Sequence, residues 1–156
     1  MIRIRPGDPA DLDRLLEIAG HSATAARWSR QEYEKLFSPE PDFRRTLLVM
    51  EEEGLVAGFI VAHAVEREWE IENIAVRGQA RRRGLGSHLL GEFLDSVRDH
   101  GGQAVFLEVR ESNMAARKLY EKWAFSEAGR RKGYYQDPPE DALVFRFSFP
   151  SAGDFH

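Results

Sequence analysis

The chain has no cysteine among its 156 residues. Disulfide bonds, thiolate metal sites and a cysteine nucleophile are therefore excluded by composition. No apolar stretch approaches the ~20 residues that a membrane-spanning helix requires. The first residues, Met1 to Arg5, also lack the apolar core of a secretory signal. We therefore expect a cytoplasmic protein in which acyl or other group transfer does not pass through a thiol.

The chain also lacks an excess of positive charge, since its formal net charge is −4. This acidic balance makes nucleic-acid binding the weakest functional class, because such domains are usually basic overall. Positive charge is local instead, at Arg81 to Arg83 and at Arg130 to Lys132, and we interpret the second cluster as a solvated face. The length fits one domain over residues 1–150, with a frayed tail at 151–156.

Alternation and helical spacing divide the chain into strands and helices in the order β-α-α-β-β-β-α-β-α-β-β. Two helix starts carry clear signals, namely Asp8-Pro9 before the first helix and the capping box Ser29 to Glu32 before the second. The runs 46–51 and 55–65, joined by an acidic turn, indicate a hairpin. A mixed sheet with helices on both faces is the architecture that this order favours.

A glycine-punctuated turn follows the strand 69–76 and opens a long amphipathic helix. The turn contains Arg81-Arg-Arg-Gly84-Leu-Gly86, which has neither the Gly-Lys-Ser/Thr ending of a P-loop nor three glycines in dinucleotide spacing. Unpaired backbone N–H groups and the positive end of a helix dipole meet at such a turn. The segment is a candidate cradle for a diphosphate.

A second informative segment runs from Phe106 to Phe125. Glu108 interrupts an apolar strand and lies on the face of Phe106 and Arg110, because Leu107 and Val109 point the other way. A partly buried carboxylate tends toward the pKa range of a general base, although a salt bridge to Arg110 and a position on an exposed face are alternatives.

Asn113 and Tyr120 in the same segment lie seven residues apart on a predicted helix over 114–123, which Asn113 can cap. They therefore share one helix face about 10 Å apart, at ~1.5 Å of rise per residue. An amide and a phenol so placed can flank an elongated ligand, whereas Tyr120 alone would be interpreted as a core aromatic.

The two segments together resemble the GNAT (Gcn5-related N-acetyltransferase) superfamily. Arg81 to Gly86 is similar to its R-x-x-G-x-G loop, and Leu107 to Phe125 is similar to L-E-V-R-x-S-N-x-x-A-x-x-L-Y-x-x-x-G-F in the form of the ribosomal-protein-alanine N-acetyltransferases. The resemblance covers residues 69–145 well and the earlier part mainly in element order. It departs at Ala124, where the motif has glycine, and at the bulkier Trp123 before it.

The resemblance implies an α/β (α+β) GNAT fold, with a mostly antiparallel sheet of six to seven strands, and acetyl-CoA as cofactor. It implies Glu108 as the base, Tyr120 as the acid that protonates the coenzyme A sulfur, and direct transfer without metal. The remaining implied contacts are with the cofactor at Ile74, Ala75, Val76, Arg81, Arg82, Arg83, Gly84, Leu85, Gly86, Ser87 and Asn113, and with the acceptor at Trp28, Asn73, Tyr134 and Tyr135.

Three functions stay open on the sequence. The first is acetylation of a protein N-terminal α-amine, possible near pH 7 because that amine has a pKa of about 8, against about 10.4 for lysine. The second is acetylation of a small amine such as a polyamine, an amino acid or an antibiotic. The third is a non-catalytic acyl-CoA sensor, disfavoured by the joint presence of Glu108 and Tyr120. A groove open to a peptide favours the first function and a closed acidic pocket favours the second.

Overall fold

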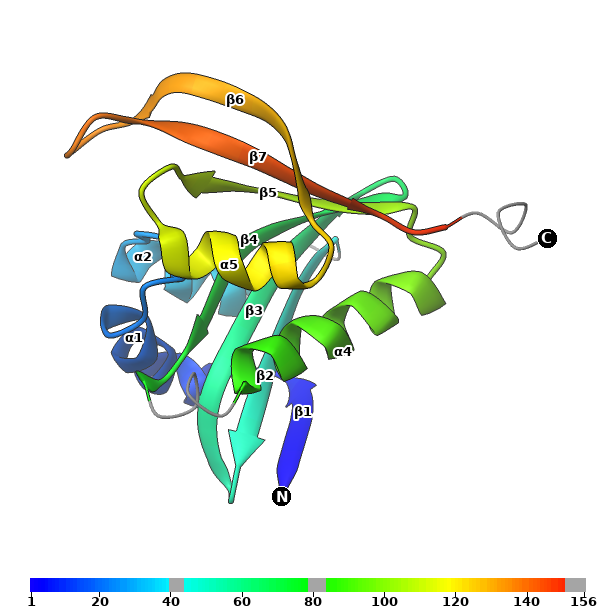
Figure 1. Cartoon of the computed structure of the whole chain (residues 1–156). Helices are drawn as coiled ribbons and strands as arrows, with labels where there is room; N and C mark the ends of the chain where they lie inside the picture. The colour runs from blue at the N-terminus through cyan, green and yellow to red at the C-terminus, as the bar shows by residue number, and fades with distance from the viewer. Residues whose placement is uncertain (40–43, 79–83, 151–156) are drawn as a thin grey trace.

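The computed structural model describes residues 1–39, 44–78 and 84–150. Its elements follow the predicted order, with two short 3-10 turns added (Figure 1). The tail predicted at 151–156 lies outside the described residues. The strands are β1 (Ile2–Pro6), β2 (Arg45–Glu52), β3 (Leu55–Val65), β4 (Glu68–Val76), β5 (Ala104–Arg110), β6 (Ser126–Tyr135) and β7 (Glu140–Ser148), and the helices are α1 (Leu12–Gly20), α2 (Arg30–Glu34), α4 (Leu85–Asp99) and α5 (Met114–Lys122), with η1 (Pro9–Asp11) and η2 (Lys35–Phe37).

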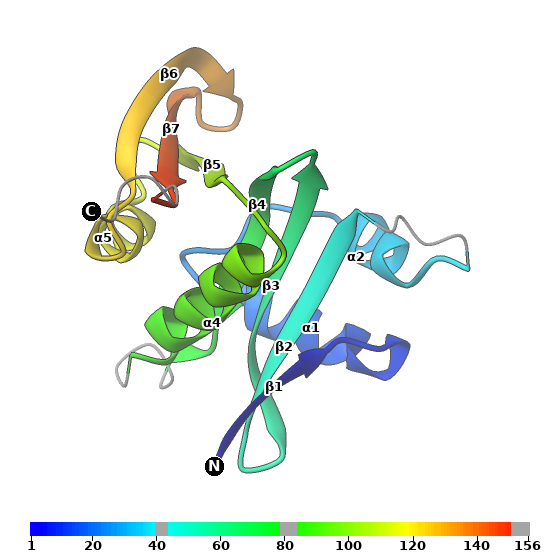
Figure 2. The ribbon, with the colours of Figure 1, turned by 90° about the vertical axis from the view of Figure 1, so that its right-hand side faces the viewer.

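The seven strands form one sheet in the order β1-β2-β3-β4-β5-β7-β6. All neighbouring pairs are antiparallel except β4 and β5, which are parallel. Helices α4 and α5 lie on one face and α1 and α2 on the other (Figure 2). The predicted mixed, mostly antiparallel sheet with helices on both faces is therefore confirmed. No helix within the described ranges is long and apolar enough to cross a membrane.

Two apolar clusters hold the layers together. Leu89, Leu90 and Phe93 of α4 pack with sheet residues and with α5 in the larger cluster. Leu15 and Ile18 of α1 pack against the opposite face of the sheet in the smaller one. Because side chains alternate along a strand, β3 and β4 supply residues to both clusters and are buried on both sides.

Strands β4 and β5 pair over their first three residues and then separate. They pair only from Glu68 to Glu70 against Ala104 to Phe106, after which β5 continues its pairing with β7 alone. At the same level the β3–β4 register slips, because Val61 pairs with Asn73 while Ala62 pairs with Ile71. Glu72 is thus the extra residue of a β-bulge, which bends its strand. The divergence opens the sheet at its centre, where the predicted catalytic segment lies.

Helix α5 ends in a turn that explains the glycine of the sequence motif. The N–H of Ala124 donates to Glu121 O and that of Phe125 donates to Tyr120 O, both at 3.0 Å, which is a Schellman arrangement. Ala124 has φ +67°, a left-handed conformation in which glycine is favoured. The alanine therefore keeps the turn that glycine would make, at some cost in backbone strain.

We expect Ala124→Gly to stabilise the protein by about 1 kcal/mol, because glycine removes the Cβ clash of the left-handed conformation. This corresponds to a rise in Tm of roughly 2–4 °C for a domain of this size. Thermal unfolding followed by circular dichroism measures the change. As a matched control, Ala115→Gly in the exposed first turn of α5 should lower Tm instead, since φ there is helical. A lower Tm for Ala124→Gly would contradict the strain argument.

Candidate active site

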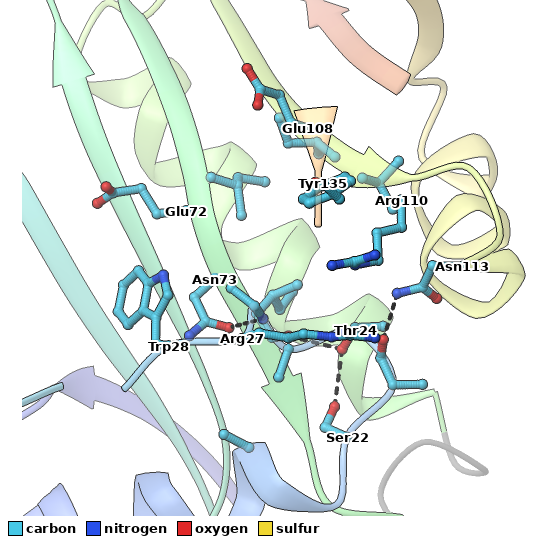
Figure 3. A pocket seen from close by; sticks show the side chains of 18 of the residues that line it. Ser22, Thr24, Arg27, Trp28, Glu72, Asn73, Glu108, Arg110, Asn113 and Tyr135 are labelled. Atoms are coloured by element: carbon cyan, nitrogen blue, oxygen red, sulfur yellow. Dashed lines mark hydrogen bonds between the residues drawn. The ribbon is translucent and has the colours of Figure 1, made fainter. Parts of the chain in front are cut away.

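A cleft of about 1060 Å³ lies where β4 and β5 diverge. Its walls come from the segment between α1 and α2, from the two diverging strands and from the loop between β6 and β7. Figure 3 shows Trp28 and Glu72 on one side of the cleft, with Arg110 and Asn113 on the other. The main lining segments are 22–28, 70–74, 107–110 and 134–137.

The open edge of β4 supplies backbone groups to the cleft. Arg77 N–H donates to Ala57 O on the β3 side, whereas Ile74 O accepts from the Thr24 hydroxyl on the other side, at 2.8 Å. Because backbone groups alternate along a strand, the N–H groups of Ile74 and Val76 point away from β3, toward the gap. Cofactor contacts were predicted at Ile74, Ala75 and Val76. The amide of Ala75 points toward β3 instead, and Ile74 lines the cleft.

Glu108 lies on the predicted face of β5 and lines the cleft. Its neighbours Leu107 and Val109 are in the core, and its side chain is 16% exposed. Arg131 of β6 forms a salt bridge with it, with Nε 3.1 Å from Oε1. The negative charge of Glu108 raises the pKa of Tyr134. Arg110 pairs with Glu140 rather than with Glu108.

The basic cluster at 130–132 is exposed, as predicted for a solvated face, but two of its arginines also form salt bridges. Arg131 binds Glu108 and lies over the ring of Tyr134, at 5.2 Å from its centroid. Arg130 pairs with Glu111 and Asp141 at 2.9 and 2.8 Å. Both arginines are exposed, yet each reaches an acid from another strand or loop. The neighbouring sequence does not show which acids the fold brings opposite them.

Tyr120 packs in the apolar core and also lines the cleft, so its position fits both a core aromatic and a residue beside a ligand. It is 3% exposed, and its ring lies 5.4 Å from that of Phe125. Burial raises the pKa of the Tyr120 hydroxyl well above its usual range. The hydroxyl is therefore protonated at neutral pH, as a proton donor must be.

Asn73 and Asn113 hold the wall of the cleft in place. Buried Asn73 accepts from Ala26 N–H at 2.8 Å and donates to the Tyr33 hydroxyl at 3.0 Å. Asn113 caps α5, as predicted, by accepting from Ala116 N–H at 3.1 Å, and it donates to Ala23 O at 2.6 Å. Both amides thus tether the segment between α1 and α2. Their predicted contacts with ligands stay predictions.

Arg110 fastens the tip of the β6–β7 hairpin over the cleft. It donates to Pro138 O and Gln136 O at 3.1 and 3.0 Å, and it stacks over the Tyr135 ring at 4.3 Å. Arg27 reaches the same tip at Asp137 O, at 2.8 Å. The sequence did not predict these contacts. The only residue that pointed to them was Arg110, which follows the Leu-Glu-Val run.

Trp28, Tyr134 and Tyr135 line the cleft, and their predicted contacts with the acceptor stay predictions. Trp28 packs against Tyr33 and under Arg45, which in turn pairs with Glu72 at 2.9 Å. Tyr134 and Tyr135 contact each other edge to face, with centroids 5.1 Å apart. Aromatic walls with polar edges suit an extended polar ligand.

The predicted anion cradle is described from Gly84 onward, and Arg81, Arg82 and Arg83 lie outside the described residues. Gly84 has φ +72° and precedes α4, whose start has no side-chain cap. Leu85 and Gly86 are buried. The Ser87 hydroxyl accepts from Trp123 Nε1–H at 2.6 Å, so this side chain ties α4 to the end of α5. The uncapped N–H groups of the first turn suit an anion.

Comparisons with known proteins agree with this geometry. The pattern of the Acetyltransferase (GNAT) family matches residues 12–125. The ribosomal protein bS18-alanine N-acetyltransferase of Escherichia coli is 37% identical over 124 residues, 78% of this chain and 81% of that protein. The enzyme of the same name from Haemophilus influenzae is 34% identical over 140 residues, 88% and 92% of the two chains.

A solved structure extends the similarity to the whole fold. The crystal structure of the ribosomal-protein-S18-alanine N-acetyltransferase from Escherichia coli superposes with a TM-score of 0.84 at 31% identity, covering 100% of this chain and 99% of that one. Sequence match, fold and the divergence of β4 and β5 point to the same conclusion. The chain belongs to the acetyltransferase (GNAT) family and is an N-acetyltransferase that uses acetyl-CoA.

Proposed function

We propose that this enzyme is an acetyltransferase of the ribosomal-protein-alanine type, which acetylates the N-terminal α-amine of a protein. The main support for this proposal is the cleft of about 1060 Å³. The segment between α1 and α2 and the loop between β6 and β7 form its walls, and Trp28, Tyr134 and Tyr135 line it. Relatives at 34–37% identity bear the name of that activity. A ribosomal protein as acceptor would place the reaction in the cytoplasm.

The residues present fit acetyl-CoA at two places. The uncapped start of α4, at Gly84 to Ser87, would hold the pyrophosphate through backbone N–H groups, with Arg81, Arg82 and Arg83 adding charge. The N–H groups of Ile74 and Val76 on the open edge of β4 would hold the pantetheine arm and polarise the thioester carbonyl. Asn113 stands at the entrance of α5 beside this path.

The chemistry divides between the two faces of the sheet. Glu108, on the side of the acceptor loops, would accept a proton from the attacking nitrogen. Tyr120, on the side of α4 and α5, would donate a proton to the departing sulfur of coenzyme A. The gap between β4 and β5 connects the two sides, so an amine and a thioester can meet within the sheet. Asn73, with Trp28, Tyr134 and Tyr135, would position the acceptor.

A small amine is the second candidate acceptor, and one observation favours it. Four acidic residues line the cleft, namely Glu70, Glu72 and Glu108 from the strands and Asp137 from the hairpin tip, and such a lining attracts a compact cation.

The test is a thiol-release assay with acetyl-CoA and four acceptors in parallel. These are a peptide that begins with alanine, the same peptide blocked at its N-terminus, a blocked peptide with an internal lysine, and a panel of small amines. We expect release with the free alanine peptide and at most background release with the blocked ones. Turnover with small amines alone would replace the proposed acceptor, and equal release with the free and the blocked alanine peptides would contradict transfer to the α-amine.

A further inference from the structure

The three glutamates that line the cleft differ in their partners. Glu72 is paired with Arg45 at 2.9 Å, and Glu108 is paired with Arg131 at 3.1 Å. The carboxylate of Glu70 makes neither a hydrogen bond nor a salt bridge with any residue in the ranges 1–39, 44–78 and 84–150. It is half-buried and faces the cleft from the last residue of β4 that still pairs with β5.

Titratable or charged groups from four strands lie around Glu70. His63 lies directly opposite on β3, Glu72 follows on β4, Glu108 lies on β5, and Arg131 reaches in from β6. Burial raises the pKa of Glu70, and the negative charges of Glu72 and Glu108 raise it further, against smaller opposing effects of His63 and Arg131. The carboxylate therefore holds a proton more readily than a solvated glutamate does.

The reaction removes two protons from the acceptor nitrogen, so a second base can take part. An ammonium R–NH₃⁺ that becomes an amide R–NH–CO–CH₃ loses two protons from nitrogen and forms one N–C bond, while the C–S bond of the thioester breaks. In the overall reaction, one proton ends on the sulfur of coenzyme A and one is released to solvent. A single carboxylate carries one proton at a time, so two carboxylates on one wall can each serve one deprotonation.

We propose that Glu70 is a second catalytic carboxylate of this site, which accepts the first proton from the acceptor's ammonium group, while Glu108 accepts the second during transfer. Glu70 has no salt-bridge partner among the described residues that the ammonium would have to displace, whereas Glu108 is held in place by Arg131. The inference rests on the proposed acetyl transfer but not on the identity of the acceptor.

The test is the pH dependence of kcat/KM for Glu70→Gln between pH 6.5 and 9.5, with the amine that the wild type acetylates fastest. If that amine is an α-amine, whose pKa is about 8, we expect a loss of about 100-fold at pH 6.5 that shrinks to less than about 5-fold at pH 9.5, because the amine deprotonates in solution there; for an amine of higher pKa the loss should shrink at correspondingly higher pH. Glu108→Gln should stay impaired over the whole range, since its proton leaves only during transfer. Glu70→Asp should regain part of the activity at low pH.

Glu68→Gln is the matched control. It removes a carboxylate two residues earlier on the same strand, where the side chain pairs with Arg146 and lies outside the cleft. It should keep the wild-type profile. Unchanged acetyl-CoA affinity and circular dichroism would show that Glu70→Gln is folded.

Two results for Glu70→Gln would overturn this role while leaving the proposed acetyl transfer intact. One is activity within about threefold of the wild type at every pH, and the other is a loss of equal size at every pH, which indicates packing or binding instead of proton transfer. A wild type that acetylates no amine would overturn the proposed function and this inference together.

Discussion

Replacing Glu108 by glutamine should lower kcat/KM for the acceptor by about 10²–10³-fold, within the range that general base catalysis contributes. The amide keeps the size of the side chain but cannot take a proton from the attacking nitrogen. Acetyl-CoA affinity should change little, because Glu108 lies on the face of the acceptor loops rather than beside α4. Steady-state kinetics in both substrates, together with calorimetric titration of acetyl-CoA, separate the two effects.

Glu111→Gln provides the comparison for Glu108. It removes a carboxylate three residues later, which pairs with an arginine of β6 in the same manner but lies outside the cleft. It should retain wild-type kcat/KM and lose at most about 1 kcal/mol of stability, as is usual for an exposed pair. Equal activity of the two variants would remove Glu108 from the chemistry.

Tyr120→Phe should lower kcat by about 10²-fold, the lower end of the range for a general acid. The change removes only the hydroxyl, so the ring contact with Phe125 and the end of α5 should persist. Tm should therefore stay within about 2 °C of the wild type, a shift that corresponds to less than roughly 1 kcal/mol in a domain of this size. Tyr120→Leu, which also removes the ring, should lose both activity and stability. Unchanged kcat in Tyr120→Phe would show that another group protonates the sulfur.

The raised pKa of Tyr120 adds a pH prediction with a definite sign. A phenol is a proton donor only below its pKa, and burial moves that pKa above the ordinary value of about 10. The wild type should therefore show no loss of kcat from ionisation of Tyr120 up to at least about pH 10. A descending limb near pH 8 that is absent in Tyr120→Phe would contradict the burial argument.

The parts of the fold predicted from sequence are those set by local physical chemistry. Alternation placed Glu108 on the face opposite Leu107 and Val109, and short-range caps located the starts of α2 and α5 at Ser29 and Asn113. Each of these depends on residues no more than four positions apart. The order of elements followed in the same way, because each period of hydrophobicity belongs to one kind of element.

The parts that could not be predicted depend on which strands become neighbours. Arg131 meets Glu108 only because β6 and β5 flank β7, and Thr24 meets Ile74 O only because a loop closes over the bulged β4. Glu70 was overlooked because a glutamate in an alternating strand is usually solvent-exposed. Its place in the cleft follows from the divergence of β4 and β5, a feature of pairing that no single segment encodes.

The most direct test of acetylation at a protein N-terminus is to locate the acetyl group on a protein acceptor. A ribosomal protein with an N-terminal alanine and free lysines would be incubated with the enzyme and acetyl-CoA, then digested and sequenced by tandem mass spectrometry. The account predicts one acetyl group on the α-amine of the first residue, and at least about 100-fold slower formation of this product with Glu108→Gln. Acetylation confined to lysine side chains, or an unmodified protein beside rapid acetylation of a small amine, would contradict it.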